Sequence, residues 1–158
     1  ATGMLRSAAM MQDDVETIAA ATDMLAEAKL TPELRNEALY FRAKAYLNQQ
    51  ADKKAMNDLQ ALAKDTRTLY GAEAKYLVAL QLYKAHEYAA AEKEILNFIE
   101  QSTPHAYWLA RSFILLSDVY VSMDKKLDAR QYLLSLQQNY HADDDIEQMI
   151  NERLEKLK

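Results

Sequence analysis

The sequence contains no cysteine, and only two glycines and two prolines stand among its 158 residues. The absence of cysteine excludes disulfides, thiolate nucleophiles and zinc or iron–sulfur centres bound through cysteine. So few glycines and prolines leave too few turn residues for a sheet of many strands, and the chain is rich in the helix formers Ala, Leu, Glu, Lys and Gln. These absences exclude an all-β fold and predict an all-α protein.

The chain also lacks an excess of positive charge and a long uninterrupted apolar run. Its formal net charge is -5, whereas sequence-independent binding of nucleic acid needs clustered Lys and Arg, so we expect no nucleic-acid partner. The most apolar long window, residues 108–123, is interrupted by Arg111 and Asp118. Because a membrane span needs a longer run of apolar residues, we expect no direct membrane insertion.

An internal repeat organises the residues that are present. Small residues recur at Ala8, Ala43, Ala79 and Ser117, at intervals of 35, 36 and 38 residues, and an alanine stands twelve residues after each of them. Large apolar residues follow both small positions at helical spacing, and only Glu27 in the first unit breaks this pattern. Such spacings place side chains on one helical stripe, so each unit is predicted to be a pair of packed amphipathic helices.

Nine helices are predicted from this periodicity and from the signals at helix ends. Thr31-Pro32 and Thr103-Pro104 each put a capping hydroxyl before a proline, whose fixed φ suits a first helical turn. The expected helices span residues 3–12, 14–29, 32–49, 53–65, 69–85, 88–101, 104–123 and 125–139. A ninth helix follows three aspartates, which suit a helix N-terminus, and its polar outer face predicts a terminal capping helix.

The stretch from Ala72 to Tyr83, together with Glu87-Tyr88-Ala89-Ala90-Ala91-Glu92 after it, resembles the tetratricopeptide repeat family. It is also similar to bacterial envelope members of that family. The resemblance implies one domain, residues 1–158, built as a right-handed superhelical array of antiparallel helix pairs, an α-solenoid, in the bacterial periplasm or cell envelope. Its parts are a weak repeat at 1–31, repeats at 32–67, 68–103 and 104–140, and a capping helix at 141–158. The sequence departs from the family at the turn residues Gln50, His86 and Asp124, where glycine is frequent, and at Arg42, where an aliphatic residue is usual.

The resemblance further implies a non-enzymatic scaffold that binds a peptide or helix of a partner protein in a concave groove. The groove positions of the family, carried over to this chain, form three stripes with the spacing i, i+3, i+7 and i+10. They are Glu37, Tyr40, Lys44 and Leu47, then Glu73, Tyr76, Leu80 and Tyr83, then Arg111, Ile114, Asp118 and Val121. The tyrosines are expected to anchor the partner, with Lys44 and Arg111 as polar handles. The alternative is that these tyrosines pack between neighbouring first helices and bind nothing.

No catalytic motif is present: the sequence has no GxGxxG, GxxxxGK[ST], HExxH or GxSxG. We therefore predict no enzymatic activity and no cofactor. His141 followed by Asp143, Asp144 and Asp145 has two interpretations, a divalent-cation site or carboxylates that cap the last helix. The capping interpretation is preferred, and no metal is predicted.

The N-terminal end departs most from the repeat. Met4, Leu5, Ala8 and Met11 form an apolar stripe on the first helix, with no preceding unit to cover it. Met4, Leu5 and Met11 are expected to form an exposed end face. We expect the first helix either to fray or to bury these residues against another molecule, a homo-oligomer being one outcome, and the chain to be the C-terminal part of a longer repeat protein. Two alternatives to a groove scaffold follow: a structural spacer or oligomerisation segment without a groove ligand, and the regulatory fragment of an enzyme.

Overall fold

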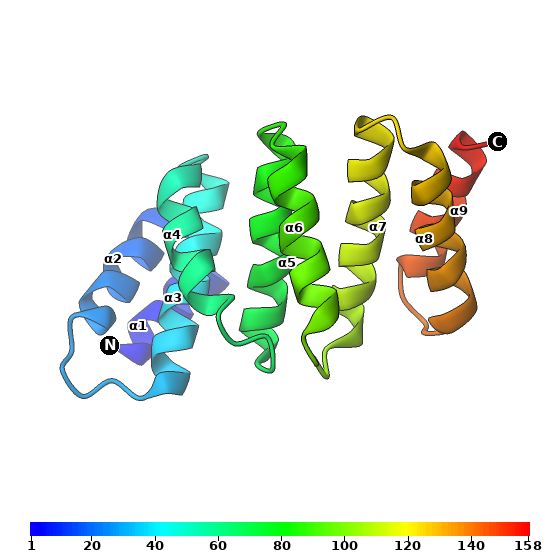
Figure 1. Cartoon of the computed structure of the whole chain (residues 1–158). Coiled ribbons are helices and arrows are strands. Elements are labelled where there is room, and N and C mark those ends of the chain that lie inside the picture. Colours follow the sequence, from blue (N-terminus) through cyan, green and yellow to red (C-terminus); the bar gives the residue numbers. More distant parts are fainter. The chain divides into compact units, whose positions relative to one another are not determined.

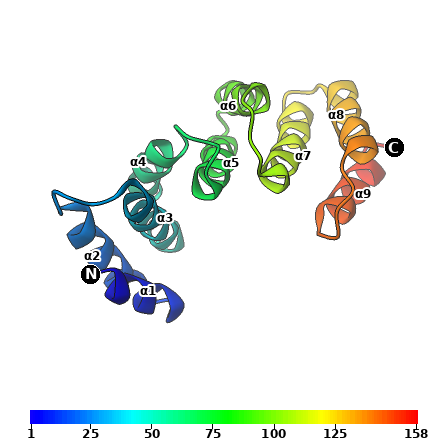
Figure 2. The same cartoon turned by 90° about the horizontal axis from the view of Figure 1, so that it is seen from below.

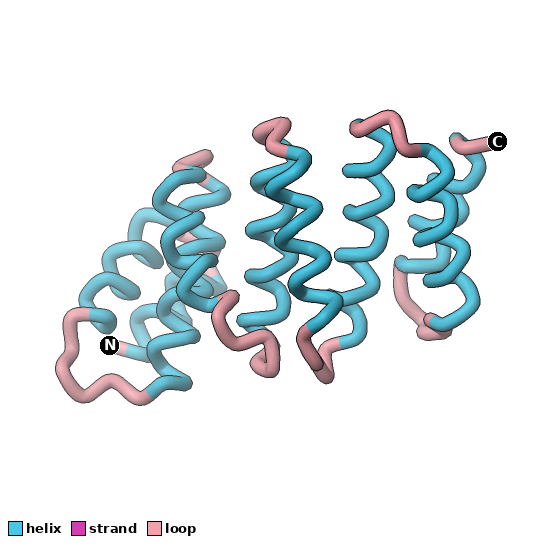
Figure 3. Tube along the Cα trace, viewed as in Figure 1, coloured by secondary structure: helices cyan, strands magenta, loops and turns pink.

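The computed structural model describes residues 1–158 and consists of helices and connecting turns, with no strand (Figure 3). The helices form two compact units, Ala1–Asp65 and Thr66–Lys158. Unit 1 contains α1 (Thr2–Met10), α2 (Asp14–Leu25), α3 (Pro32–Asn48) and α4 (Asp52–Leu62). Unit 2 contains α5 (Leu69–Lys84), α6 (Tyr88–Glu100), α7 (Ala106–Ser122), α8 (Lys126–Asn139) and α9 (Ile146–Lys156) (Figure 1). The predicted all-α fold of packed consecutive helices is confirmed, and no helix combines the length and hydropathy that crossing a bilayer requires.

In unit 1, α1 packs against α2 and α3, and α3 also packs against α4. The core between the first three helices is formed by Leu5, Ala21, Met24 and Ala38, all of which are almost fully inaccessible to solvent. The burial of Leu5 corrects the expectation that it belongs to an exposed end face. Its side chain lies on the side of α1 that faces the rest of unit 1, where burial of a leucine stabilises the fold by about 2 kcal/mol.

In unit 2, α5 and α6 form one pair and α7 and α8 form the next. Helix α7 packs against both helices of the preceding pair, and α9 packs against α7 and α8 in the same way. Within this unit α5 and α7 lie on one side, and α6 and α8 lie on the other (Figure 2). Ile146 and Ile150 of α9 are buried on Ala110, Ile114 and Leu133. The last helix therefore covers the apolar edge of the α7–α8 pair.

A left-handed residue lies in the turn between the two helices of every pair. Gln12, Gln50, His86 and Asp124 have φ of 55°, 59°, 63° and 60°, and they recur at intervals of 38, 36 and 38 residues. The amide after each of them donates back to the chain: Asp13 to the Ala8 carbonyl, Ala51 to Tyr46, Glu87 to Leu82, and Lys125 to Tyr120. The turn thus keeps the conformation that glycine adopts most easily, although no glycine is present at these positions.

This turn gives the register of the repeat, and it corrects the predicted register of the first pair. Counted back from the turn, Leu5 and not Ala8 corresponds to the small residues of the later pairs, which are Ala43, Ala79 and Ser117. Each first helix ends two residues before its left-handed residue, so the shorter α1, with 9 residues against 17 in α3 and α7, differs at its start and not at the turn. Gln12 comes four residues after Ala8, whereas the turn residue comes seven after each of the small residues in the later pairs.

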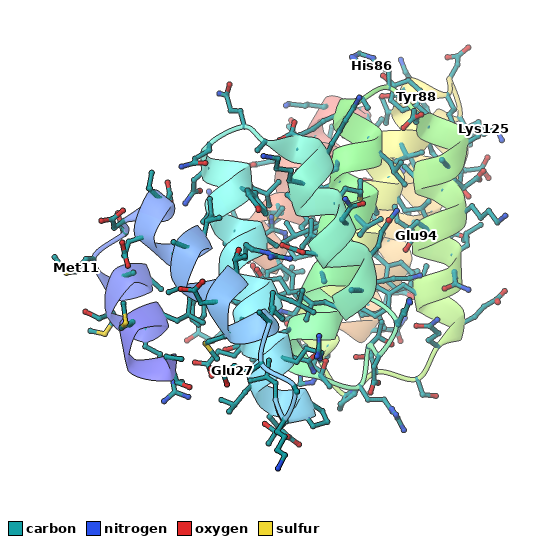
Figure 4. All side chains as sticks on the ribbon, turned by 90° about the vertical axis from the view of Figure 1, so that its left-hand side faces the viewer. Met11, Glu27, His86, Tyr88, Glu94 and Lys125 are labelled. Carbon is teal, nitrogen blue, oxygen red and sulfur yellow. The ribbon has the colours of Figure 1, made fainter.

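The same correction applies to α2. Counted forward from the turn, buried Thr17 and not Ala20 corresponds to the alanines of α4, α6 and α8, which are Ala55, Ala91 and Ala129. Met24 then corresponds to Leu62, Phe98 and Leu136, all of them buried. Glu27 is no longer an exception, because it lies beyond the end of α2 (Figure 4).

Helix ends agree with the sequence at one Thr-Pro pair and differ at the other. The Thr31 hydroxyl accepts a hydrogen bond from the amide of Leu34 at 3.2 Å, with Pro32 at the first helical position, as predicted. Thr103 instead donates to the carbonyl of Thr66 at 2.7 Å, and α7 begins only at Ala106. The predicted start at residue 104 is wrong because the Thr103 hydroxyl ties the connecting segment to the start of the unit. Helix α2 also ends earlier than predicted, at Leu25.

Candidate binding surface

Helices α5, α7 and α9 supply the polar and aromatic side chains of one face of unit 2. Helix α7 lies against both of the others. Arg111 and Asp118 are seven residues apart on α7, so they project from the same side of that helix. Each of them is held by a neighbouring helix, Arg111 by α5 and Asp118 by α9.

Arg111 joins α5 to α7. Its Nη2 donates to the hydroxyl of Tyr76 at 3.1 Å, its Nη1 donates to the hydroxyl of Tyr107 at 2.9 Å, and its guanidinium lies 5.1 Å from the centre of the Tyr76 ring. The Tyr76 ring also contacts Trp108, with 5.6 Å between centroids, and the tyrosine is only 6% exposed. Tyr76 and Arg111 therefore contribute to packing between first helices, which was the alternative interpretation, and their role in binding stays a prediction.

Asp118 joins α7 to α9 through a bidentate ion pair. Arg153 donates from Nε to Oδ1 at 2.8 Å and from Nη2 to Oδ2 at 2.9 Å. These hydrogen bonds raise the pKa of Arg153, because they favour the charged guanidinium. Arg153 also donates to the carbonyl of Met149 at 3.3 Å. The pair orients α9 so that its C-terminal half lies beside the C-terminal half of α7.

A hollow of about 510 Å³ lies where the C-terminal ends of α5, α7 and α9 meet the start of α8. Tyr83, Val121 and Leu157 give it apolar walls, and the Asp118–Arg153 pair forms part of its lining. Val121 is 40% exposed, which is unusual for an aliphatic side chain on a helix as buried as α7. Lys126 and Lys156 also line the hollow, and neither forms an ion pair with this chain. Glu152 lines the hollow as well and forms no ion pair, so the hollow combines exposed apolar surface with two unpaired positive charges and one unpaired carboxylate.

The predicted groove residues have different positions in the structure. Tyr40, Lys44 and Leu47 lie on α3 of unit 1, where the Lys44 ammonium is 5.7 Å from the centre of the Tyr40 ring. Tyr83, Asp118 and Val121 line the hollow of unit 2, whereas Leu80 on the same stripe of α5 does not. Glu37 is paired with Arg6, at 2.6 Å and 2.9 Å. Ile114 is wrong as a groove position, because it is buried in the core beneath α9.

The sequence interpretation missed the contribution of α9 to this surface. Arg153, Lys156 and Leu157 line the hollow, as does Lys126 at the start of α8. The sequence does contain a signal for this contribution, because α9 follows a complete helix pair. A helix that packs on both members of the preceding pair stands where a first helix stands, so its side chains continue the face formed by α5 and α7.

The segment before α9 supports the capping interpretation of its aspartates. Asp144 accepts a hydrogen bond from the amide of Ile146 at 3.0 Å and another from the hydroxyl of Tyr140 at 2.5 Å. Burial and this second bond raise the pKa of Tyr140 to about 12. Asp145 accepts from the hydroxyl of Tyr107 at 3.0 Å. No group of three or more His, Cys, Asp or Glu side chains is arranged to hold a metal ion.

The chain matches no protein-family model, no curated protein and no solved structure. Membership of the tetratricopeptide repeat family therefore stays a prediction.

Proposed function

We propose that the protein is a non-enzymatic scaffold of the tetratricopeptide repeat kind, and that unit 2 binds a helix or peptide segment of a partner protein. The observation that carries this proposal is the hollow between α5, α7 and α9. Its volume, about 510 Å³, is within the range of ligand-binding clefts. Exposed apolar side chains rimmed by charges are also typical of protein interaction sites.

The side chains of the hollow define the chemistry of the partner. An apolar side chain of a docked helix would contact Tyr83, Val121 and Leu157, which offer contact area with few rotamers to immobilise. Lys126 and Lys156 require no rearrangement of an existing ion pair before they bind a carboxylate. The partner segment therefore carries an apolar stripe flanked by Asp or Glu.

A displayed library of amphipathic helical peptides, selected on the full chain, tests this proposal. Binding of the selected peptide is measured by fluorescence anisotropy for the original chain, for Val121→Glu and for the double variant Lys126→Glu/Lys156→Glu. Both variants are expected to weaken binding by about tenfold or more, since each places negative charge against an acidic, apolar ligand. Leu127→Glu is the control, because Leu127 is also an exposed aliphatic residue, 82% accessible against 40% for Val121, and it lies on α8 without lining the hollow.

Two results contradict the proposal. One is a selection that yields no peptide bound more tightly than its scrambled sequence. The other is a selected peptide whose affinity changes as much in Leu127→Glu as in Val121→Glu, because binding then does not depend on the hollow.

A further inference from the structure

A second surface, on unit 1 and independent of the hollow, carries an inference of its own. The outer side of α1 and the turn after it expose three methionines, with Met4 60%, Met10 85% and Met11 78% accessible. Figure 4 shows Met11 projecting away from the chain. Gly3 and Ser7 lie between the methionines and are exposed as well. We call these five residues, Gly3, Met4, Ser7, Met10 and Met11, the α1 ridge.

The register set by the left-handed turn shows what the α1 ridge corresponds to in unit 2. Gln12 corresponds to Asp124, so Met4 corresponds to Leu116, Ser7 to Val119 and Met10 to Ser122. Leu116 and Val119 are completely buried, whereas Ser122 is exposed. The positions of Met4 and Ser7 are therefore covered on α7 and uncovered on α1, whereas the position of Met10 is exposed on both helices.

The preceding helix pair is what faces these positions. Trp108 of α7 contacts Tyr76 of α5, and Val119 lies on the same side of α7 because eleven residues complete about three helical turns. In unit 1 the counterpart of Met4 on α3 is Arg42, whose Nη1 donates to Thr22 of α2 at 3.2 Å. In both units this stripe of a first helix meets the pair that comes before it.

We propose that the α1 ridge is the docking surface for one more antiparallel helix pair, of the kind formed by α5 and α6. Such a pair continues an interface that the chain already forms between α7 and the α5–α6 pair. Gly3 and Ser7 let a helix approach α1 closely, and a side chain added at Gly3 meets no atom within 4 Å. The flexible methionines adapt to the surface that covers them.

The charges at the α1 ridge argue against a second copy of the chain as the occupant. A hollow of about 340 Å³ beside Met4 and Met11 is also lined by Asp13 and Glu16. Two copies joined face to face through this hollow bring these carboxylates together, which is unfavourable. At the other end of the chain, α9 already covers the edge of the last pair and exposes polar residues, among them Glu147 and Glu155.

The chain itself supplies the probe for the test. Residues 69–113, which contain α5, α6 and the start of α7, are placed directly before Thr2 in place of Ala1. Phe113 then takes the position of Ala1, to which it corresponds in the register of the turn, so the grafted pair precedes α1 as it precedes α7. Oxidation of each methionine by hydrogen peroxide is then followed by mass spectrometry. We expect Met4 to become as slow as buried Met24, while Met10 stays as reactive as in the original chain because its counterpart Ser122 is exposed.

Two matched controls separate docking from a general effect of the added residues. A graft of residues 69–111 has nearly the same composition but is two residues shorter, which rotates the added pair out of register with α1. Met4 is expected to stay reactive in this graft. Ser7→Val, which introduces the residue found at 119, raises the Tm of the in-register graft and leaves that of the original chain nearly unchanged. A second in-register graft, residues 2–39 before Thr2, repeats the test with α1 and α2, the pair on which α3 packs.

The proposal is overturned if Met4 in the folded in-register grafts stays as reactive as Met10, or if neither graft folds. It is also overturned if sedimentation shows the original chain to be a dimer that Met4→Glu converts to a monomer. The surface is in that case an interface between two copies.

Discussion

Arg42 of α3 donates two hydrogen bonds to the carboxylate of Asp58 on α4, from Nε at 2.8 Å and from Nη2 at 2.7 Å. The repeat register places Arg42 where α7 has Leu116, and Asp58 where α8 has Tyr132. A part-buried ion pair thus stands in the α3–α4 pair at two positions where the α7–α8 pair has a leucine and a tyrosine. The departure from an aliphatic residue at Arg42 is compensated by Asp58, a partner that sequence reasoning did not identify.

Removing one member of this pair is expected to destabilise unit 1. Asp58→Ala should cost about 2 to 3 kcal/mol, because the Arg42 side chain is only 20% exposed and loses its counter-ion. The double variant Arg42→Leu/Asp58→Tyr, which copies the residues at 116 and 132, should recover most of the loss. Urea unfolding measures both variants, and a double variant no more stable than Asp58→Ala contradicts the assigned register.

The corrected register of the first pair makes a second prediction. Thr17→Leu should cost about 1 to 3 kcal/mol, because Thr17 is buried and corresponds to the alanines of α4, α6 and α8 that are completely inaccessible to solvent. Ala20 is also buried, but Ala20→Leu should cost less, because its counterparts Asp58, Glu94 and Tyr132 are all larger than alanine. Thermal unfolding compares the two variants. If Ala20→Leu destabilises the protein more than Thr17→Leu does, the result supports the register that aligns Ala8 and Ala20 with the alanines of the later pairs.

Tyr76 and Tyr83, two of the three tyrosines of α5, should separate stability from binding. Tyr76→Ala removes a buried ring and the hydrogen-bond acceptor of Arg111, so it should cost about 3 kcal/mol or more. Tyr83→Ala should cost less, about 1 kcal/mol for the lost contact with the Tyr88 ring, but weaken the selected peptide, since Tyr83 lines the hollow. Anisotropy and urea unfolding on the same samples provide both quantities. A Tyr83 variant that loses stability and keeps full affinity assigns this tyrosine to the core.

Acid should weaken unit 1 in part through Glu37. Hydrogen bonds from Arg6 hold the pKa of Glu37 below its usual value of 4.5 in the folded state. A lowered folded pKa stabilises the protein above that usual value, and the contribution is lost as the pH falls through the folded pKa. Arg6 is 59% exposed, so the contribution is below about 1 kcal/mol.

Glu37→Gln should therefore lower the unfolding free energy near neutrality and have a smaller effect at about pH 3, because the contribution of the charged carboxylate decreases as the pH falls from 4.5 towards the folded pKa. Urea unfolding at the two pH values measures the difference. An equal loss at both values assigns the effect to packing of the side chain and not to its charge.

The fold was predictable because helix periodicity and pairing depend on local spacings that the sequence displays directly. The first pair was placed one helical turn out of register because Ala8 and Ala20 match the alanine pattern by chance, whereas the left-handed residue Gln12 carries no glycine signal. The start of α7 was misplaced because the Thr103 hydroxyl bonds to Thr66, a partner 37 residues away.

The candidate surface was predictable only in part. Tyr83 and Asp118 were identified by their spacing along a first helix, and both line the hollow. Arg153 and Lys156 come from a helix that the sequence indicated as a cap, so their contribution depends on the tertiary position of α9. Spacing along one helix does not show which side chains another helix covers, and for that reason Ile114 was assigned to the groove.

The most direct test of the scaffold account is photo-cross-linking of the selected helical peptide to the full chain. A benzophenone amino acid is placed either at position 121, on the wall of the hollow, or at position 127, on the exposed outer side of α8. The account predicts a cross-link from position 121 that unlabelled peptide competes away, and none from position 127. A cross-link from position 127 without one from position 121 contradicts it.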